Sequence, residues 1–148
     1  MSDAHLEVRP FVEADRPELV ELWRRCDLVR PWNDPDRDID RKVALADGLL
    51  LVGLRSRVLV ASVMAGYDGH RGWLNYLAVD PGERGGGVGR LLVGEAERRL
   101  SALGCPKLNL QIRRSNLDAV GFYTSLGYVE DDVISMGKRL IHDDGPAQ

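Results

Sequence analysis

Residues 77–92 read LAVDPGERGGGVGRLL, and within this stretch the sequence pattern changes from that of a strand to that of a helix. An apolar run typical of a buried strand ends in the turn cluster DPG at residues 80–82. Three consecutive glycines follow at residues 85–87, although glycine loses more backbone freedom on folding than any other residue. From Val88 the apolar residues recur at helical spacing. The stretch therefore predicts a strand, a glycine turn and a helix in that order.

The glycine turn has the features of an anion-binding site. The first N–H groups of a helix have no partner within the helix, and the helix dipole is positive there. A P-loop is excluded because Gly89 is followed by Arg90 and not by Lys with Ser or Thr. A dinucleotide fingerprint fits poorly, because Gly85 and Gly87 could be its first two glycines but Arg90 stands at the third. The pattern Arg/Gln-x-x-Gly-x-Gly/Ala fits Arg84, Gly87 and Gly89, which favours a phosphate cradle over a tight turn without a ligand.

The elements on either side of this turn predict a mixed sheet. We expect strands over residues 5–11, 49–55, 58–67, 72–79 and 107–112, helices over residues 15–26, 36–46, 88–103 and 115–127, and one or two final strands within residues 128–140. Three strands in succession indicate antiparallel pairing at the start of the sheet. The strand–helix–strand unit at residues 73–112 adds a parallel pair.

Composition and charge are those of a globular protein of one domain, residues 1–148. Hydrophobic residues make up 44% of the chain and charged residues 29%. The net charge of -3 argues against a dedicated nucleic-acid-binding protein. Cys26 and Cys105 stand in no metal motif, which favours free thiols over a disulfide or a catalytic cysteine. No signal peptide or long apolar segment is apparent, so we expect a cytoplasmic protein that does not enter a membrane.

The stretch at residues 77–92 is similar to the acetyl-CoA-binding motif of the GNAT family of N-acetyltransferases. A second segment, NLDAVGFYTSLGY at residues 116–128, is similar to the next signature of that family. Both occur in the family's order and spacing, and the resemblance covers nearly the whole chain. Two further segments, RCDLVRPWNDP and GYDGHRG, resemble a YpeA-type subgroup of predicted acetyltransferases. The resemblance implies an α/β fold with a central mixed sheet of six to seven strands and about four helices on both faces.

The resemblance also implies the residues that bind acetyl-CoA as co-substrate, with no metal. In this family the strand before the glycine turn diverges from its parallel neighbour, and pantetheine lies in the gap. The corresponding residues here are Leu77, Ala78 and Val79 for the pantetheine amides, Arg84, Gly85, Gly86, Gly87, Val88, Gly89 and Arg90 for the pyrophosphate, and Asn116 for the cofactor arm. The alternative role of Asn116 is a helix cap.

Two catalytic roles follow from the same resemblance. Tyr123 matches the tyrosine that protonates the departing thiolate, unless it is only a core residue. Many relatives have a Glu base on the strand before the glycine turn, but residues 73–77 contain no carboxylate here. Asp68 or His70 at the neighbouring strand end is one alternative. An acid in the last hairpin, such as Asp131 or Asp132, and a water chain through Tyr76 are the others.

The turn RPWNDP at residues 30–35 is the candidate acceptor site. Its two prolines restrict the backbone, so the side chains between them are presented in a preset geometry. Trp32 beside Asp34 could hold a cationic amine, whereas Arg30 and Arg71 suit a carboxylate. The candidate substrate-binding residues are Arg30, Trp32, Asn33, Asp34 and Arg71. The alternative is that Trp32 only fills the core beneath the two helices.

These observations predict an N-acetyltransferase that moves an acetyl group from acetyl-CoA directly to a primary amine of a small molecule, an amino acid or a protein N-terminus. A CoA-binding sensor without catalytic activity, and a transferase that uses another acyl-CoA, are the alternatives. The expected partner is a small-molecule or peptide amine, with a homodimer as one open possibility and no nucleic acid.

Overall fold

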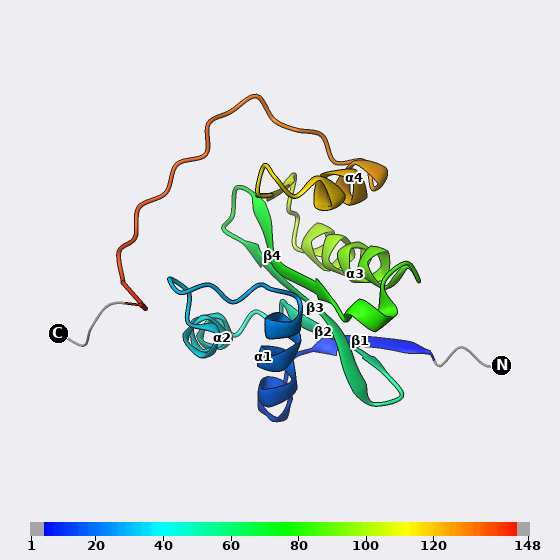
Figure 1. Ribbon diagram of the computed structural model, residues 1–148. Coiled ribbons are helices and arrows are strands. Elements are labelled where there is room, and N and C mark those ends of the chain that lie inside the picture. Colours follow the sequence, from blue (N-terminus) through cyan, green and yellow to red (C-terminus); the bar gives the residue numbers. More distant parts are fainter. Residues whose placement is uncertain (1–4, 145–148) are drawn as a thin grey trace.

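A five-stranded sheet forms the centre of the computed structural model, which describes residues 5–144 (Figure 1). The strands are β1 (Leu6–Pro10), β2 (Leu50–Arg55), β3 (Val58–Tyr67), β4 (Gly72–Val79) and β5 (Leu108–Leu110). The helices are α1 (Arg16–Arg25), α2 (Pro35–Ala44), α3 (Val88–Ala102) and α4 (Leu117–Ser125), with short 3-10 turns η1 (Glu13–Asp15) and η2 (Pro81–Glu83). No helix among these residues is long and apolar enough to cross a membrane.

The strands lie in chain order across the sheet, and their pairing confirms the mixed topology. The first four strands pair antiparallel, with Val8 opposite Gly53 and Val52 opposite Ser62. Only β4 and β5 pair parallel, as the strand–helix–strand unit around the glycine turn predicts. The described part of β5 is short and forms one edge of the sheet.

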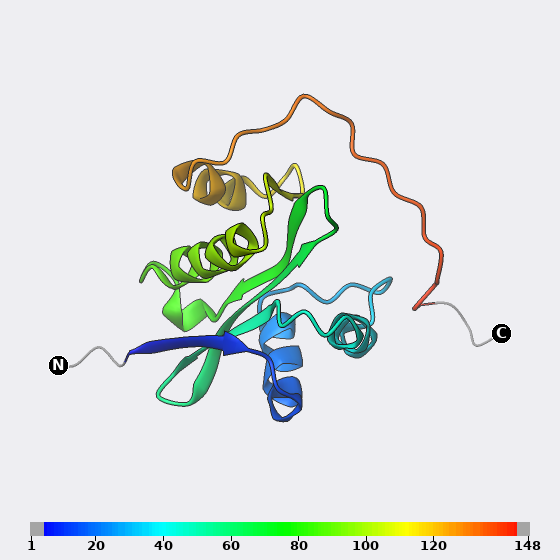
Figure 2. The same cartoon turned by 180° about the vertical axis from the view of Figure 1, so that it is seen from behind.

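Two helices cover each face of the sheet, as Figures 1 and 2 show from opposite sides. The helix α1 packs Leu19, Leu22 and Trp23 into one core with Val52 from β2. Its apolar residues recur at helical spacing, and these three side chains are fully buried. The stripe Val88, Leu92, Ala96 and Leu100 of α3 lies in a second core on the other face, to which α4 contributes Tyr123.

The expected sixth and seventh strands are absent from the described residues. Residues 128–140, which were expected to supply them, form an extended segment without strand pairing. No backbone hydrogen bond joins residues 129–141 to another described residue. A strand exists only where a neighbouring strand satisfies its backbone groups. Since nothing in the described chain pairs with this segment, the alternating pattern of its sequence does not produce a strand.

Candidate functional site

The outer edge of β4 is open along its second half. The strand pairs with β5 only from Gly72 to Leu74, and it continues to Val79 without a parallel neighbour. A β-bulge on the β3–β4 pair, between Ser62 and Met64, accompanies this divergence. Tyr76 lies in the bulge and has a left-handed backbone, with φ 51°. The open half of β4 therefore has no strand on its outer side over the residues predicted to bind pantetheine, although the backbone oxygen of Val79 accepts hydrogen bonds from Cys26 Sγ and Arg84 Nε, each at 3.3 Å.

The glycine turn continues directly from this open edge. Gly85 and Gly87 have φ values of 83° and 81°, in the left-handed region that glycine tolerates best. Gly87 is the N-cap of α3, and no side chain caps the helix. Within the described chain, none of the backbone N–H groups from Arg84 to Arg90 donates a hydrogen bond. A Cβ atom added to Gly85 or Gly87 would meet no other group within 4 Å.

These N–H groups fit an anionic ligand. Seven consecutive unpaired donors at a helix N-terminus, with open space before them, suit the pyrophosphate of CoA. Gly89 has a different role, because a Cβ atom there would lie 3.2 Å from Cζ of Phe122 and 3.5 Å from Cγ2 of Val79. This glycine allows the start of α3 to approach α4 and β4 closely.

The hydroxyl of Tyr123 is available for proton donation. The residue is 8% exposed, and its ring packs edge-on against Phe122 and Tyr128, with centroids 5.0 and 5.4 Å away. Burial raises the pKa of Tyr123 to about 12. Its hydroxyl makes no hydrogen bond with another described residue. A buried ring with an unpartnered donor agrees with the expected acid role as well as with a core role.

Asn116 is the N-cap residue of α4. Its Oδ1 atom accepts a hydrogen bond from the backbone N–H of Ala119 at 3.1 Å. The cap uses only the side-chain oxygen, so the amide nitrogen can still donate to a ligand. The contact with the cofactor arm stays a prediction.

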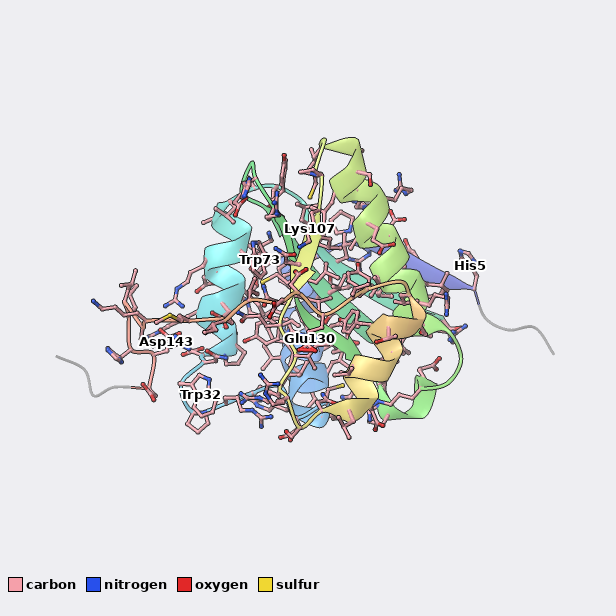
Figure 3. All side chains as sticks on the ribbon, turned by 90° about the horizontal axis from the view of Figure 1, so that it is seen from above. His5, Trp32, Trp73, Lys107, Glu130 and Asp143 are labelled. Carbon is pink, nitrogen blue, oxygen red and sulfur yellow. The ribbon has the colours of Figure 1, made fainter. Side chains whose placement is uncertain are left out.

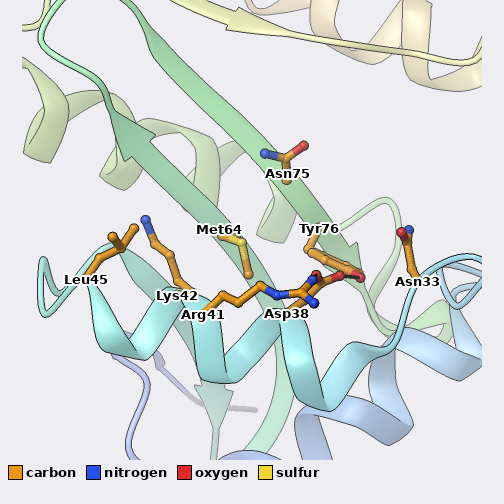
Figure 4. A pocket seen from close by; sticks show the side chains of 8 residues that line it. All are labelled: Asn33, Asp38, Arg41, Lys42, Leu45, Met64, Asn75 and Tyr76. Carbon is orange, nitrogen blue, oxygen red and sulfur yellow. Dashed lines mark hydrogen bonds and ion pairs between the residues drawn. The ribbon is translucent and has the colours of Figure 1, made fainter. Parts of the chain in front are cut away.

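An open hollow of about 410 Å³ lies between α2 and the bulge of β4 (Figure 4). Its lining residues are Asn33, Asp38, Arg41, Lys42, Leu45, Met64, Asn75 and Tyr76. The hydroxyl of Tyr76 donates to Oδ2 of Asp38 at 2.6 Å. Burial, and then the bond to Asp38, raise the pKa of Tyr76 above its usual value. A carboxylate and a phenol in direct contact thus lie beside the open edge of β4.

Tyr76 is held in place from behind by two buried side chains. Its ring stacks on Trp23 of α1, with centroids 3.8 Å apart and an interplanar angle of 14°. Trp23 Nε1 donates to Ser62 Oγ at 2.9 Å, and that hydroxyl donates to the backbone oxygen of Tyr76 at 2.8 Å. These contacts fix both the ring and the left-handed backbone of Tyr76.

The candidate bases Asp68 and His70 lie in the β3–β4 turn, away from this hollow. Oδ1 of Asp68 accepts hydrogen bonds from the N–H groups of Arg71 and His70, at 2.7 and 2.8 Å. These bonds lower the pKa of Asp68. The turn precedes β4, so roughly 13 Å of strand separates it from Tyr76 at ~3.3 Å per residue. Asp68 therefore has a structural role in the turn, and a catalytic role for it or His70 stays a prediction.

The predicted acceptor residues divide between the hollow and its surroundings. Asn33 lines the hollow, whereas Asp34 caps α2 by accepting from the N–H groups of residues 36 and 37. Trp32 is 42% exposed, and the Arg113 guanidinium lies 5.6 Å from its ring centroid. Such exposure does not suit a residue that only fills the core. Arg30 lies within the same loop and bonds Asp27 at 3.3 Å.

Arg71 belongs to the distant β3–β4 turn, where it bonds the backbone oxygen of His70 at 3.0 Å. Asp131 and Asp132, the remaining candidate bases, lie on the extended C-terminal segment. Asp131 forms an ion pair with Lys107 at 2.8 Å. The structure thus brings neither Arg71 nor Asp131 to the hollow.

The main residues missed by the sequence interpretation are on α2. Asp38, Arg41, Lys42 and Leu45 all line the hollow, and they recur at i, i+3, i+4 and i+7. This spacing places them on one helix face, on which Lys42 is itself buried. The sequence feature that could have indicated this site is a stripe of acidic and basic residues on a short amphipathic helix. The same feature is also typical of a helix face that only contacts solvent.

Comparison of the sequence with known proteins identifies the family. A family model described as "Acetyltransferase (GNAT) family" matches residues 16–128. A Yersinia enterocolitica protein named acetyltransferase is 48% identical over 138 residues, which span 93% of this chain and 98% of the relative.

Two solved structures share the fold. An AAC(6')-Iy structure in complex with a bisubstrate analogue of CoA and acetylneamine has a TM-score of 0.72 and 20% identity, covering 91% of this chain and 99% of the other. The ribosomal-protein-S18-alanine N-acetyltransferase of Escherichia coli has a TM-score of 0.71 and 23% identity, covering 86% of this chain and 79% of the other.

Proposed function

The chain belongs to the GNAT family of acetyltransferases, and we propose that it transfers an acetyl group from acetyl-CoA to a primary amine. The amine would belong to a small molecule, an amino acid or a protein N-terminus. Structural neighbours support this range, since one is named as an aminoglycoside acetyltransferase and another as an alanine N-acetyltransferase of a ribosomal protein.

One observation carries the proposal: the second half of β4 has an open outer edge, and the unpaired N–H groups of the glycine turn follow it a few residues later. The strand has no parallel neighbour beyond Leu74, and the seven N–H groups from Arg84 to Arg90 have no partner in the described chain. An extended ligand with amides at one end and a pyrophosphate at the other would satisfy both sets. Acetyl-CoA has this form and supplies the activated acetyl group.

The hollow beside α2 would receive the acceptor amine. As the amine nitrogen bonds to the thioester carbon, its remaining protons become strongly acidic. Tyr76 and Asp38 could remove one of them: Tyr76 Oη takes the proton from nitrogen while its own proton passes to Asp38 along the 2.6 Å hydrogen bond. The carboxylate would also bind the cationic form of the amine, which must release one proton to solvent before its nitrogen can attack the thioester carbon. Asp38 of α2 thus supplies the carboxylate that β4 lacks, and Tyr76 of β4 passes the proton to it.

Proton delivery to the leaving group would come from Tyr123. When the carbon–sulfur bond breaks, the thiolate takes the hydroxyl proton of Tyr123, whose raised pKa of about 12 keeps it protonated beforehand. The two tyrosines would thus have opposite roles, one at the amine and the other at the sulfur.

Calorimetry and turnover assays with two variants test the two halves of this proposal. Gly86→Glu adds a negative charge to the cradle, and Gly86 has no positive φ that would make a side chain strained. We expect it to abolish acetyl-CoA binding, whereas the control Gly86→Ala retains it. Asp38→Asn should keep acetyl-CoA affinity and lower kcat/KM for amines by roughly 10²–10⁴.

The outcome separates the alternatives. Unchanged acetyl-CoA affinity in a folded Gly86→Glu variant would contradict the cradle. Tight binding without CoA release, across a panel of aminoglycosides, amino acids and peptide N-termini, would favour a sensor. Faster turnover with another acyl-CoA than with acetyl-CoA would reassign the donor.

A further inference from the structure

A buried carboxylate lies against the outer side of α2. Asp143 is close to the end of the described chain, yet its side chain is only 1% exposed. Figure 3 shows it beside this helix, and its oxygens are bound by Arg37 and Arg41, which stand on successive turns. Aspartate side chains at the surface are mostly exposed to water. Such burial indicates a site whose shape and charge fit a carboxylate.

The geometry at Arg41 is that of specific carboxylate binding. Its Nη2 atom donates to Oδ1 of Asp143 at 2.7 Å, and its Nη1 atom donates to Oδ2 at 3.1 Å. Two bonds from one planar guanidinium to both carboxylate oxygens are stronger and more specific than a single contact. Arg37 Nη1 adds a third bond, to Oδ1 at 3.4 Å. The hydrogen bond from Arg41 is the main cause that lowers the pKa of Asp143 to about 2.

The surroundings of this site carry more positive charge than Asp143 neutralises. A second open hollow, of about 380 Å³, is lined by Arg41, Lys138, Arg139, Leu140 and Ile141. Within residues 5–144, neither Lys138 nor Arg139 forms an ion pair. Three basic side chains and no acidic one therefore line this hollow, and such a lining attracts a ligand with negative charge.

The carboxylate site adjoins the hollow proposed for the acceptor amine. Arg41 lines that hollow as well, and its Nη1 atom bonds Oδ1 of Asp38 at 3.4 Å. Figure 4 shows the guanidinium of Arg41 beside the carboxylate of Asp38, whose other oxygen accepts from Tyr76. One guanidinium thus contacts both the group proposed to bind the amine and the carboxylate of Asp143. A ligand with an amine and a carboxylate can span these two points.

We propose that Arg37 and Arg41 bind a carboxylate of the acceptor, so that the preferred substrates are amines that also carry a carboxylate group. This inference rests on the proposed acetyl transfer and names its substrate class. In the free protein Asp143 occupies the site, and the carboxylate of the acceptor displaces it. The amine then lies at Tyr76 and Asp38.

The segment that carries Asp143 is suited to such an exchange. Residues 129–141 make no backbone hydrogen bond with another described residue, and their six large apolar side chains are between 59% and 90% exposed. A segment with so few contacts leaves its position at a small free-energy cost. Asp143 therefore acts as an internal competitor, which lowers the apparent affinity for the acceptor only by the fraction of time for which it fills the site.

Matched pairs of acceptors test the substrate class. Glycine, β-alanine and 4-aminobutanoate are compared with their carboxamides, which keep the amine and the chain length but lack the charge. We expect the parent to have a higher kcat/KM for the acid than for the carboxamide in the pair of best length. Arg37→Gln and Arg41→Gln should each lower this ratio by roughly tenfold to a hundredfold, because each removes a charged hydrogen bond to the carboxylate.

The ratio separates carboxylate binding from general damage. Loss of active protein, a disturbed Asp38 and the different amine pKa values of acid and carboxamide affect both members of a pair in the same way for every variant. The matched control is Arg98→Gln, which removes an arginine paired with Glu95 on the exposed surface of α3. It should leave the ratio unchanged.

The role of Asp143 has its own test. Asp143→Asn removes the negative charge that competes with the acceptor, so KM for the acid should fall by about threefold to tenfold, whereas KM for the carboxamide stays constant. Asp144→Asn removes the same charge from the next residue, which is exposed and has no ion pair within the described chain. This control should change neither KM value.

Calorimetry measures the same preference without turnover. The protein saturated with CoA is titrated with 4-aminobutanoate and with its carboxamide, and the acid should bind more tightly in the parent but not in Arg41→Gln. If no amine is acetylated, the proposed function fails, and the titration still decides whether a carboxylate is bound.

Four results would overturn the inference. They are equal values for acid and carboxamide in the parent, a ratio that Arg37→Gln and Arg41→Gln leave unchanged, a KM for the acid that Asp143→Asn does not lower, and a stronger preference for aminoalkyl phosphates than for the amino acids. The first three would mean that the two arginines only anchor the C-terminal segment, and the fourth would assign the site to phosphate.

Discussion

Tyr76 links the fold to the proposed chemistry at the scale of a single residue. A tyrosine with positive φ is strained, and such strain persists only when neighbouring contacts over-determine it. Here Trp23 stacks on the ring, and Ser62 bonds the backbone oxygen. The result is a phenol aimed at Asp38 beside the open strand edge, in a chain that lacks a carboxylate on β4.

The acid role of Tyr123 predicts a defined kinetic change. Tyr123→Phe removes the only proton that the residue can donate, so kcat should fall by roughly 10²–10⁴ with little change in acetyl-CoA affinity. Tyr128→Phe is the matched control, because its hydroxyl bonds Glu97 at 2.7 Å and its ring only packs against Tyr123. A turnover number equal to that of the parent would remove Tyr123 from the mechanism.

The raised pKa of Tyr123 also predicts the alkaline pH dependence. The acid form is required, and it is lost only as pH rises through the folded-state pKa of about 12. An unperturbed tyrosine would lose its proton near pH ~10. We therefore expect that deprotonation of Tyr123 does not lower kcat near pH 10. A pH profile of kcat, measured over the range in which the protein stays folded, tests this expectation.

At the scale of elements, β4 has two functions in succession. Its first three residues pair with β5 and complete the sheet, and its last residues leave β5 and offer an open edge. The bulge that separates these halves also turns Tyr76 towards α2. A single irregularity therefore accompanies the open edge proposed to bind acetyl-CoA and positions one wall of the hollow proposed for the acceptor.

The contact between α1, β3 and β4 through Ser62 can be tested directly. Ser62→Ala leaves the buried N–H of Trp23 without an acceptor, and the free energy of unfolding should fall by about 1–3 kcal/mol in urea titrations. Because Tyr76 also loses its backbone bond, KM for the amine should rise more than the acetyl-CoA Kd. Ser101→Ala, on the exposed face of α3, should change neither quantity, and equal effects of both substitutions would contradict the role assigned to Ser62.

At the scale of the whole molecule, the extended C-terminal segment of residues 129–141 exposes six apolar side chains. If folded chains pair as a homodimer, mass action stabilises the folded state as protein concentration rises. The melting temperature of the parent should therefore increase by about 2–4 °C per tenfold increase in concentration. A parent melting temperature that is independent of concentration would indicate a monomer.

Much of the fold follows from local sequence patterns. The apolar spacing in residues 16–25 and 88–102 predicts amphipathic helices, and the glycines of residues 85–87 predict a turn with free N–H groups. These features depend on neighbours within a few positions, where backbone geometry and side-chain period determine the structure. The mixed sheet and the cradle are therefore accessible from the sequence by itself.

The hollow beside α2 and the conformation of the C-terminal segment, residues 129–141, were decided only by tertiary structure. Asp38 and Tyr76 are 38 residues apart, and no local pattern of either segment indicates that they meet. The C-terminal segment has the composition of a strand, but a strand requires a neighbour for its backbone groups, and no adjacent segment of the sequence supplies that neighbour. Local sequence thus determines which elements can form, whereas the packing of distant elements determines which side chains share a site and which edges stay open.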